Sequence, residues 1–230
     1  MINRDTPPIS GNGPSDAALL LDRGLEMLGL MVSAEQRSQL LGFAGEIERF
    51  NPRLGLVEAE GAELMRRHLL DCAAGLPVIR SLMARAGAPG RCTLADLGSG
   101  AGLPGVPLAI LEPRLRVTLI ERSGRRVGFL RNLRAVLRLA DVQIEELPFE
   151  RCSATFDYVT FRALTEITPG SAERLAPLVN PNGYLVAYKG RRERAETEAS
   201  ALQRVFSPVE LHELAVPFLD EQRYLVVARR

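Results

Sequence analysis

From residue 93 onward, the sequence alternates short apolar segments with longer segments of helical periodicity. Segments of strand length include "TLADL", "RVTLIE" and "YLVAYK", and helical patterns such as "RRVGFLRNLRAVLRL" stand between them. Strands that alternate with helices form right-handed crossovers, which place parallel strands in one sheet and helices on both of its faces. The pattern therefore predicts an α/β fold with a mostly parallel sheet of seven strands.

The last two strand segments follow a different rule. "VELHELAVPF" and "RYLVVARR" are joined by "FLDEQ", which is too short to hold a crossover helix. A short connection joins antiparallel strands. We expect the C-terminal strand to run antiparallel inside or beside the sheet.

The segment before residue 91 is predicted to be a helical extension, residues 15–90. Ser33 followed by Gln36 forms a capping box for its second helix, which "FNPRLG" should end. A third helix is expected over "AELMRRHLLDCAAGLPVI". Residues 1–14 are rich in Pro, Gly, Asn and Ser and are predicted to be a disordered tail, and residues 91–230 the α/β domain.

The net charge, the cysteine spacing and the length of the apolar runs indicate which kinds of ligand and partner the chain can bind. The formal charge of +1 over 230 residues does not favour unaided binding to nucleic acid, so any basic surface must be local. Cys72, Cys92 and Cys152 are far apart and form no CxxC pair, which indicates neither a metal site nor a disulfide framework. We find no apolar run long enough for a membrane helix and no signal-peptide core, and we expect a cytoplasmic protein with no membrane partner.

The segment from Asp96 to Gly105, "DLGSGAGLPG", carries the chemistry of the chain. It follows a strand and opens a helix, and its glycines allow a tight turn and close approach of a ligand to the backbone. Glu121 ends the next strand segment, where a carboxylate can accept hydrogen bonds from the ribose hydroxyls of a nucleoside. The segment is typical of a nucleoside-binding turn.

The glycines alone fit either a nicotinamide dinucleotide or S-adenosylmethionine. Asp96 suits the ammonium of a methionine moiety, and Pro104 removes a backbone N–H from the place where a pyrophosphate needs one. An antiparallel C-terminal strand is the usual end of a class I methyltransferase sheet. These features favour S-adenosylmethionine; a dinucleotide enzyme and a glycine-rich turn without a ligand stay as alternatives.

Five motifs resemble, in the same order, those of one family. "RRHLLDC", "DLGSGAGLPGVPLAI", "TLIERSGRRVGFLRNL", "FRAL" and "AYKG" are similar to the motifs of the bacterial 16S ribosomal RNA guanine-N7 methyltransferases, called RsmG or GidB. The resemblance covers roughly residues 40–230. It implies a Rossmann-like class I methyltransferase fold and transfer of a methyl group from S-adenosylmethionine to N7 of a guanine in the decoding-region hairpin of small-subunit rRNA.

The resemblance also implies where the cofactor lies. It places the cofactor against Gly98, Leu103, Glu121, the pair Leu147–Pro148, and Arg162. With the neighbouring residues of the turn and strand ends, the expected cofactor site comprises Asp96, Gly98, Ser99, Gly100, Gly102, Leu103, Glu121, Arg122, Glu146, Leu147, Pro148 and Arg162.

The chemistry of N7 methylation agrees with what the sequence contains. Guanine N7 has a free in-plane lone pair, so no general base is needed and catalysis depends on alignment. "FRAL" differs from the Asp/Asn/Ser-Pro-Pro-aromatic motif of enzymes that methylate exocyclic amines. The expected catalytic residues are Lys189, Arg162 and His68, and Asp71 lies one helical turn from His68.

Lys189 is the only lysine in a chain with 29 basic residues. It ends a strand at the edge where parallel sheets bind ligands, and its compact charge could reach a phosphate or the guanine O6. The alternative is an ordinary surface residue. The expected RNA-binding residues are Arg66, Arg67, Arg125, Arg126, Lys189, Arg191 and Arg192, whereas Arg131, Arg134 and Arg138 are expected on the solvent side of a helix.

Three positions depart from the family pattern. Gly55 stands where an asparagine is usual, Glu146 where an arginine is usual, and Phe161 where a serine is usual. Two alternatives therefore stay open besides an rRNA methyltransferase. One is a non-catalytic protein that binds rRNA or assists ribosome assembly, and the other is a class I methyltransferase that acts on another RNA or a small molecule. We expect a monomer whose partner is the small ribosomal subunit.

Overall fold

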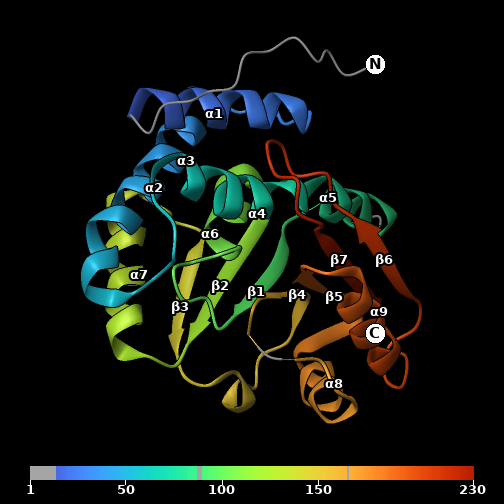
Figure 1. Cartoon of the computed structure of the whole chain (residues 1–230). Helices are drawn as coiled ribbons and strands as arrows, with labels where there is room; N and C mark the ends of the chain where they lie inside the picture. The colour runs from blue at the N-terminus through green and yellow to red at the C-terminus, as the bar shows by residue number, and fades with distance from the viewer. Residues whose placement is uncertain (1–13, 87–89, 165) are drawn as a thin grey trace.

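The computed structural model describes residues 14–86, 90–164 and 166–230. The predicted tail lies outside these residues except for position 14, where helix α1 begins. The centre of the molecule is a seven-stranded sheet of order β3-β2-β1-β4-β5-β7-β6 (Figure 1). Its strands are β1 (Cys92–Leu97), β2 (Leu115–Glu121), β3 (Val142–Glu146), β4 (Phe156–Arg162), β5 (Val179–Lys189), β6 (Val209–Glu213) and β7 (Tyr224–Arg229).

The strand directions confirm the prediction for both ends of the sheet. The first five strands pair in parallel, and β7 lies between β5 and β6 and is antiparallel to both. The order reverses at β1, which has β2 on one side and β4 on the other. Ligands of such sheets bind beyond the carboxyl ends of the strands at this switch point.

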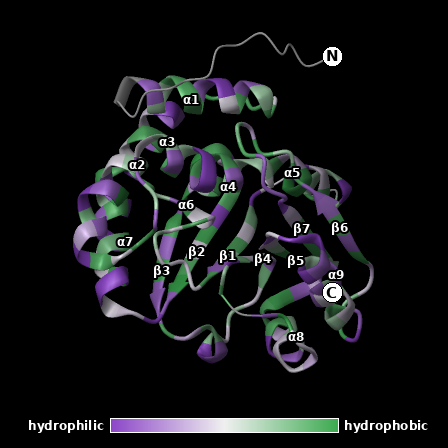
Figure 2. Cartoon of the chain, in the orientation of Figure 1, coloured by the Kyte–Doolittle hydropathy of each residue, from purple (hydrophilic) through white to green (hydrophobic). Residues whose placement is uncertain are grey.

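Helices cover both faces of the sheet. Alternate residues of a strand point to opposite faces, so Leu94 belongs to one apolar cluster and Ala95 to the other. The helices before β1 and the helices that follow β1 and β2 cover the first face, and α8 (Pro169–Leu175) and α9 (Arg192–Leu202) cover the second (Figure 1). Figure 2 shows apolar and polar residues mixed along these helices, as expected for helices with one buried side. The α-helices are α1 (Pro14–Met27), α2 (Ala34–Leu54), α3 (Gly61–Leu64), α4 (Asp71–Ala74), α5 (Leu76–Arg85), α6 (Gly105–Leu111), α7 (Gly124–Val136), α8 (Pro169–Leu175) and α9 (Arg192–Leu202), with short 3-10 turns at Phe149–Arg151 and Ala176–Leu178.

The predicted start of α2 is confirmed. The backbone N–H of Gln36 donates to Ser33 Oγ at 3.1 Å, and the N–H of Ser33 donates to Gln36 Oε1 at 2.9 Å. The helix continues through Pro52 and ends at Gly55, whose left-handed backbone (φ 55°, ψ 54°) closes it. Glycine adopts this conformation without backbone strain, and asparagine, which the resemblance implies at this position, also tolerates it.

The predicted third helix is not one regular helix. A π-helical segment, Met65–Leu70, joins α3 to α4, and α5 follows Gly75. Short π-helical segments often occur at functional sites. This one carries His68 and leads directly into Asp71.

The segment "NPNG", residues 180–183, has a composition typical of a turn but lies inside β5. The pairing of β4 with β5 shifts register between Phe156 and Tyr158 at this place, and Asn182 has φ 66°. Asparagine is one of the few residues that adopt positive φ easily, so the strand can continue through an irregularity.

Candidate functional site

The glycine turn connects β1 to α6 at the switch point of the sheet. Gly98, Gly100 and Gly102 all have positive φ, at 64°, 54° and 86°. A Cβ on Gly98 would lie only 2.3 Å from Leu164 Cδ1, so the segment after β4 passes directly over the turn. The turn therefore needs glycine for both its conformation and its close packing.

Asp96 is fully buried beneath this turn. Its Oδ2 accepts the N–H of Gly105 at 3.0 Å, whereas its Oδ1 has no hydrogen-bond partner among the described residues. Burial raises the pKa of Asp96 to about 7. A buried carboxylate oxygen without a partner suits a positively charged ligand group.

Glu121 ends β2 beside the turn and is also buried. Its two carboxylate oxygens accept the N–H groups of Gly100 at 3.0 Å and Ser123 at 2.8 Å. Each oxygen has two lone pairs, so both can still accept a hydrogen bond from a ligand.

A hollow of about 340 Å³ opens in front of Glu121. Five of the expected cofactor residues line it, namely Gly98, Glu121, Arg122, Leu147 and Pro148. The other lining residues are Ile120, Arg126, Phe149, Glu150, Ala163, Leu164 and Arg174. Arg174 comes from α8, on a segment with no motif that could have indicated its place. We call this space the cofactor hollow.

The remaining expected cofactor residues do not line this hollow; Asp96 lies buried beneath the turn, and Arg162 lines a larger, separate cavity. Ser99, Gly100, Gly102 and Leu103 form the turn itself, and Ser99 Oγ donates to the backbone oxygen of Asp96 at 2.8 Å. Glu146 ends β3 next to Glu121, but its exposed carboxylate forms an ion pair with Arg131 at 3.2 Å. The negative charge of Glu146, at a position where the resemblance implies an arginine, is thus neutralised by Arg131.

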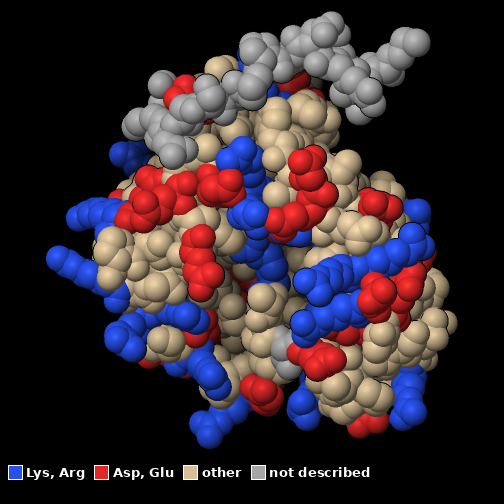
Figure 3. Space-filling view, in the orientation of Figure 1, with Lys and Arg blue, Asp and Glu red and all other residues tan. Residues whose placement is uncertain are grey.

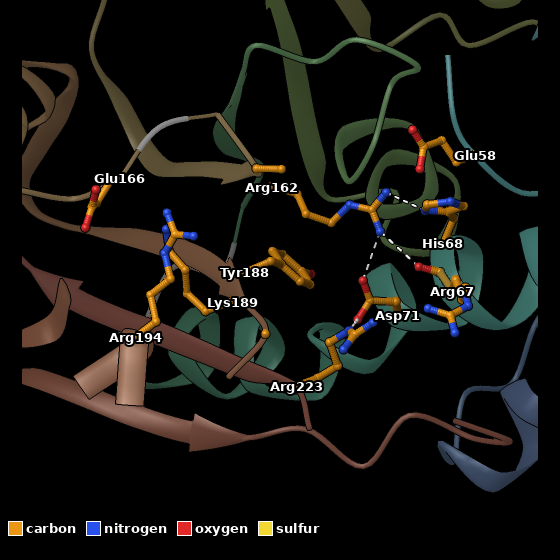
Figure 4. A pocket seen from close by; sticks show the side chains of 12 residues that line it. Glu58, Arg67, His68, Asp71, Arg162, Glu166, Tyr188, Lys189, Arg194 and Arg223 are labelled. Carbon is orange, nitrogen blue, oxygen red and sulfur yellow. Dashed lines mark hydrogen bonds and ion pairs between the residues drawn. The ribbon is translucent and has the colours of Figure 1, made fainter. Parts of the chain in front are cut away.

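A larger cavity of about 720 Å³ is shown in Figure 4. It adjoins the cofactor hollow, because Ala163 lines both. Arg162, at the end of β4, crosses it and binds the π-helical segment. Its Nη1 donates to Asp71 Oδ2 at 2.9 Å and to the backbone oxygen of Arg67 at 3.0 Å, and its Nη2 lies 2.6 Å from His68 Nδ1. His68 and Asp71, which were predicted to share a helix face, are therefore joined by Arg162, which lies more than 90 positions away in the chain.

The charges of this group determine the protonation of its members. Burial, and next the nearby charge of Arg162, lower the pKa of His68 to about 3, so the imidazole is neutral and accepts from Arg162. Asp71 is buried; burial raises its pKa while Arg162 and Arg223 act in the opposite direction. Arg223 Nε lies 3.3 Å from Asp71 Oδ1, which makes an ion pair without an aligned hydrogen bond.

Lys189 lines the larger cavity, but its positive charge is already neutralised by a carboxylate of the same chain. Its ammonium forms an ion pair with Glu198 of α9 and lies 5.2 Å from the centre of the Phe161 ring. The side chains of Lys189 and Glu198 are only 8% and 1% exposed. Burial lowers the pKa of Lys189 and Glu198 raises it. The family departure at Phe161 thus provides an aromatic surface beneath the lysine.

The expected RNA-binding residues differ in how far they are engaged. Arg66 and Arg67 both bind Glu63, and Arg192 binds Glu196. Arg125, Arg126 and Arg191 form no ion pair within the part of the chain that the structure describes. Figure 3 shows a hollow in the middle of this face, with basic side chains running into it between acidic ones.

The described residues contain no group of His, Cys, Asp and Glu side chains arranged to hold a metal ion. None of their helices is long and apolar enough to span a bilayer.

The family model for GidB, described as rRNA small subunit methyltransferase G, matches residues 36–226. The chain belongs to this family. It is 36% identical over 218 residues to ribosomal RNA small subunit methyltransferase G of Xanthomonas euvesicatoria, a match that covers 94% of this chain and 96% of the relative. The protein of the same name from Aromatoleum aromaticum is 34% identical over 221 residues, covering 93% and 99%.

Solved structures confirm the class I methyltransferase fold of this GidB family member. A predicted O-methyltransferase from Agrobacterium tumefaciens superposes with a TM-score of 0.54 at 21% identity, over 70% of this chain and 80% of that one. A methyltransferase from Pyrococcus furiosus gives a TM-score of 0.53 at 13% identity, over 86% and 98%. At these identities the likeness concerns the fold alone.

Proposed function

We propose that this chain uses S-adenosylmethionine to methylate N7 of a guanine in small-subunit rRNA. The observation that carries the proposal is the pair of adjoining spaces at the switch point of the sheet. The cofactor hollow and the larger cavity meet at Ala163, so a cofactor in one can face a base in the other. Membership of the GidB family supports rRNA as the substrate class.

The residues of the cofactor hollow fit S-adenosylmethionine. Glu121 has free lone pairs for the ribose hydroxyls, and Leu147 and Pro148 provide an apolar wall for the adenine. The unpartnered Oδ1 of Asp96 suits the ammonium group, directly or through water. When bound, S-adenosylmethionine supplies a methyl group on a positively charged sulfur.

The larger cavity suits an acceptor that needs no proton removed. Guanine N7 attacks with its in-plane lone pair, so alignment is the main requirement. His68 has a pKa of about 3 and is held by Arg162, which makes it a poor proton acceptor at neutral pH. We assign His68 and Arg162 the role of shaping the wall against which the base stacks, and Lys189 a place on the opposite side.

RNA phosphates would be bound outside the cavities. Arg125 and Arg191 are the best candidates among the expected residues, because no carboxylate of the described chain pairs with them and neither lines either cavity; Arg126 is also unpaired there but lines the cofactor hollow. Arg66, Arg67 and Arg192 would first have to leave an acidic partner.

Titration calorimetry and methyl transfer test the proposal together. We expect S-adenosylmethionine to bind, and labelled methyl groups to enter small ribosomal subunits or their rRNA. A protein that binds rRNA without binding S-adenosylmethionine would be the non-catalytic alternative. Transfer only to a small molecule would contradict the RNA assignment.

A further inference from the structure

The larger cavity contains one charged side chain without a partner in the described chain, Glu58. Every basic residue that lines the cavity already has an ion pair: Arg67 with Glu63 and Glu221, Arg162 and Arg223 with Asp71, and Lys189 and Arg194 with Glu198. Glu166 also has an interaction of its own. Glu58 forms no hydrogen bond or ion pair with any described residue. In the described chain, the arginine and lysine side chains that line the cavity are therefore all in ion pairs, whereas the carboxylate of Glu58 is available to a ligand.

The backbone that carries Glu58 is held in place by Asn51. Asn51 Oδ1 accepts the N–H groups of Leu56 at 2.8 Å and Val57 at 3.0 Å, and Asn51 Nδ2 donates to the backbone oxygen of Val57 at 2.8 Å. The loop after α2 is thus tied to the helix immediately before Glu58. A side chain presented from a fixed backbone loses less entropy when it binds a ligand.

The larger cavity adjoins two smaller hollows. Glu58 and Arg67 also line a neighbouring hollow of about 570 Å³, whereas the cofactor hollow meets the cavity at Ala163. In Figure 4, Glu58 lies at the end of the cavity near His68 and Arg162, away from Lys189 and Glu166. A guanine whose N7 points toward the cofactor hollow at Ala163 can present its opposite edge to Glu58.

That opposite edge has the chemistry that a carboxylate binds. Guanine presents two donors there, the N1–H and the 2-amino group, and an ionised carboxylate accepts both. Adenine presents an acceptor at N1 and would leave the carboxylate without its hydrogen bonds.

Methylation strengthens the same contact. The N7 lone pair forms the new bond to carbon, the sulfur–carbon bond breaks with its electrons left on sulfur, and no proton is lost. The positive charge passes from sulfur to the base, which makes N1–H a stronger donor. An acceptor placed there binds the transition state more tightly than the substrate, and only such differential binding increases kcat.

We propose that Glu58 accepts hydrogen bonds from the N1–H and 2-amino groups of the target guanine and stabilises the positive charge that the base acquires. The inference rests on the proposed function, because it requires a guanine in the larger cavity. It assigns both base selection and rate enhancement to one side chain.

The test compares Glu58→Gln with Glu60→Gln on small subunits that lack the methyl group. Glu60 is the matched control, because it is exposed, lies two residues away and does not line the larger cavity. We expect Glu58→Gln to lower kcat by roughly 10- to 100-fold, the effect of losing a hydrogen bond to a charged group. KM should not rise, because the substitution also removes a negative charge that repels the RNA phosphates. Affinity for S-adenosylmethionine should not change.

A kcat unchanged in Glu58→Gln, or lowered equally in Glu60→Gln, would overturn the inference. A wild-type protein that methylates no small-subunit RNA would instead overturn the proposed function. A binding measurement adds a readout without turnover: by ligand-observed NMR, wild type should prefer the cationic 7-methylguanosine over guanosine, and Glu58→Gln should lose that preference. Equal preference in both proteins would contradict the role of Glu58.

Discussion

Lys189, the only lysine of the chain, forms a buried ion pair with Glu198 of α9. Glu198 also binds Arg194 through its other oxygen at 2.9 Å. A buried carboxylate depends on its cations, since its desolvation is otherwise uncompensated. The lysine at the ligand edge of the sheet is therefore also a structural link between β5 and α9.

Lys189→Met should lower the free energy of unfolding by about 3 kcal/mol, because the variant leaves Glu198 buried with only Arg194 as its partner. Urea unfolding measures this effect. Glu196→Gln breaks the exposed pair with Arg192 on the same helix and should cost at most about 0.5 kcal/mol. Equal effects of the two substitutions would show that burial of the Lys189 pair has no energetic consequence.

Glu121→Gln should weaken binding of S-adenosylmethionine by about 10-fold or more. Each carboxylate oxygen accepts a backbone N–H, from Gly100 or Ser123, and an amide has only one oxygen with which to do so. The amide NH₂ that replaces one carboxylate oxygen would also present a donor, and not an acceptor, to the ribose hydroxyls. Calorimetry measures the affinity, and Glu145→Gln, on the exposed side of β3, is the control. Wild-type affinity in Glu121→Gln would contradict the assignment of the hollow.

Gly105→Ala should destabilise the fold by about 1–3 kcal/mol through overpacking. The added Cβ would lie 2.5 Å from Leu119 Cδ2 and 2.7 Å from Asp96 Oδ2. Gly128→Ala, in α7, meets nothing within 4 Å and should instead stabilise the protein by about 0.5–1 kcal/mol. Thermal unfolding distinguishes the two, and a neutral Gly105→Ala would mean that α6 can move away from the sheet.

Asp96 should make the stability of the protein without cofactor depend on pH. Burial raises its pKa from 3.8 to about 7, so its contribution is most favourable below about pH 4 and is lost as pH rises through about 7. Asp96→Asn should remove this decline. The difference in the free energy of unfolding between wild type and Asp96→Asn should therefore change with pH. A difference that stays constant from about pH 4 to 8 would contradict the raised pKa.

The same residue gives an expectation for binding. A cationic group beside Asp96 favours the ionised carboxylate, so binding below about pH 7 must release a proton. Affinity for S-adenosylmethionine should therefore rise between about pH 6 and 8 in wild type and vary less in Asp96→Asn. A wild-type affinity as flat as that of the variant would place the ammonium elsewhere.

The features predicted well from the sequence depend on residues close together in the chain. The capping box of Ser33 and Gln36 lies within one helical turn, and the glycine turn is one continuous segment. The antiparallel β7 followed from the length of one connection. Gly98 and Glu121 could be assigned to one site because parallel strands end at the same edge of a sheet.

What the sequence did not indicate depends on distant contacts. Asp71 meets Arg162 across 91 residues, and Arg174 reaches the cofactor hollow from α8. The π-helical segment Met65–Leu70 has no simple sequence signal, and only the folded chain shows that Glu198 matches the charge of Lys189. Whether a charge is available to a ligand is decided by its partners, which lie elsewhere in the chain.

Identification of the methylated nucleoside tests the account most directly. Small subunits without the modification are incubated with the protein and labelled S-adenosylmethionine, and their rRNA is hydrolysed to nucleosides and analysed by mass spectrometry. The account predicts that the label appears in 7-methylguanosine. Label in another methylated nucleoside, or none in rRNA while the protein binds S-adenosylmethionine, would contradict it.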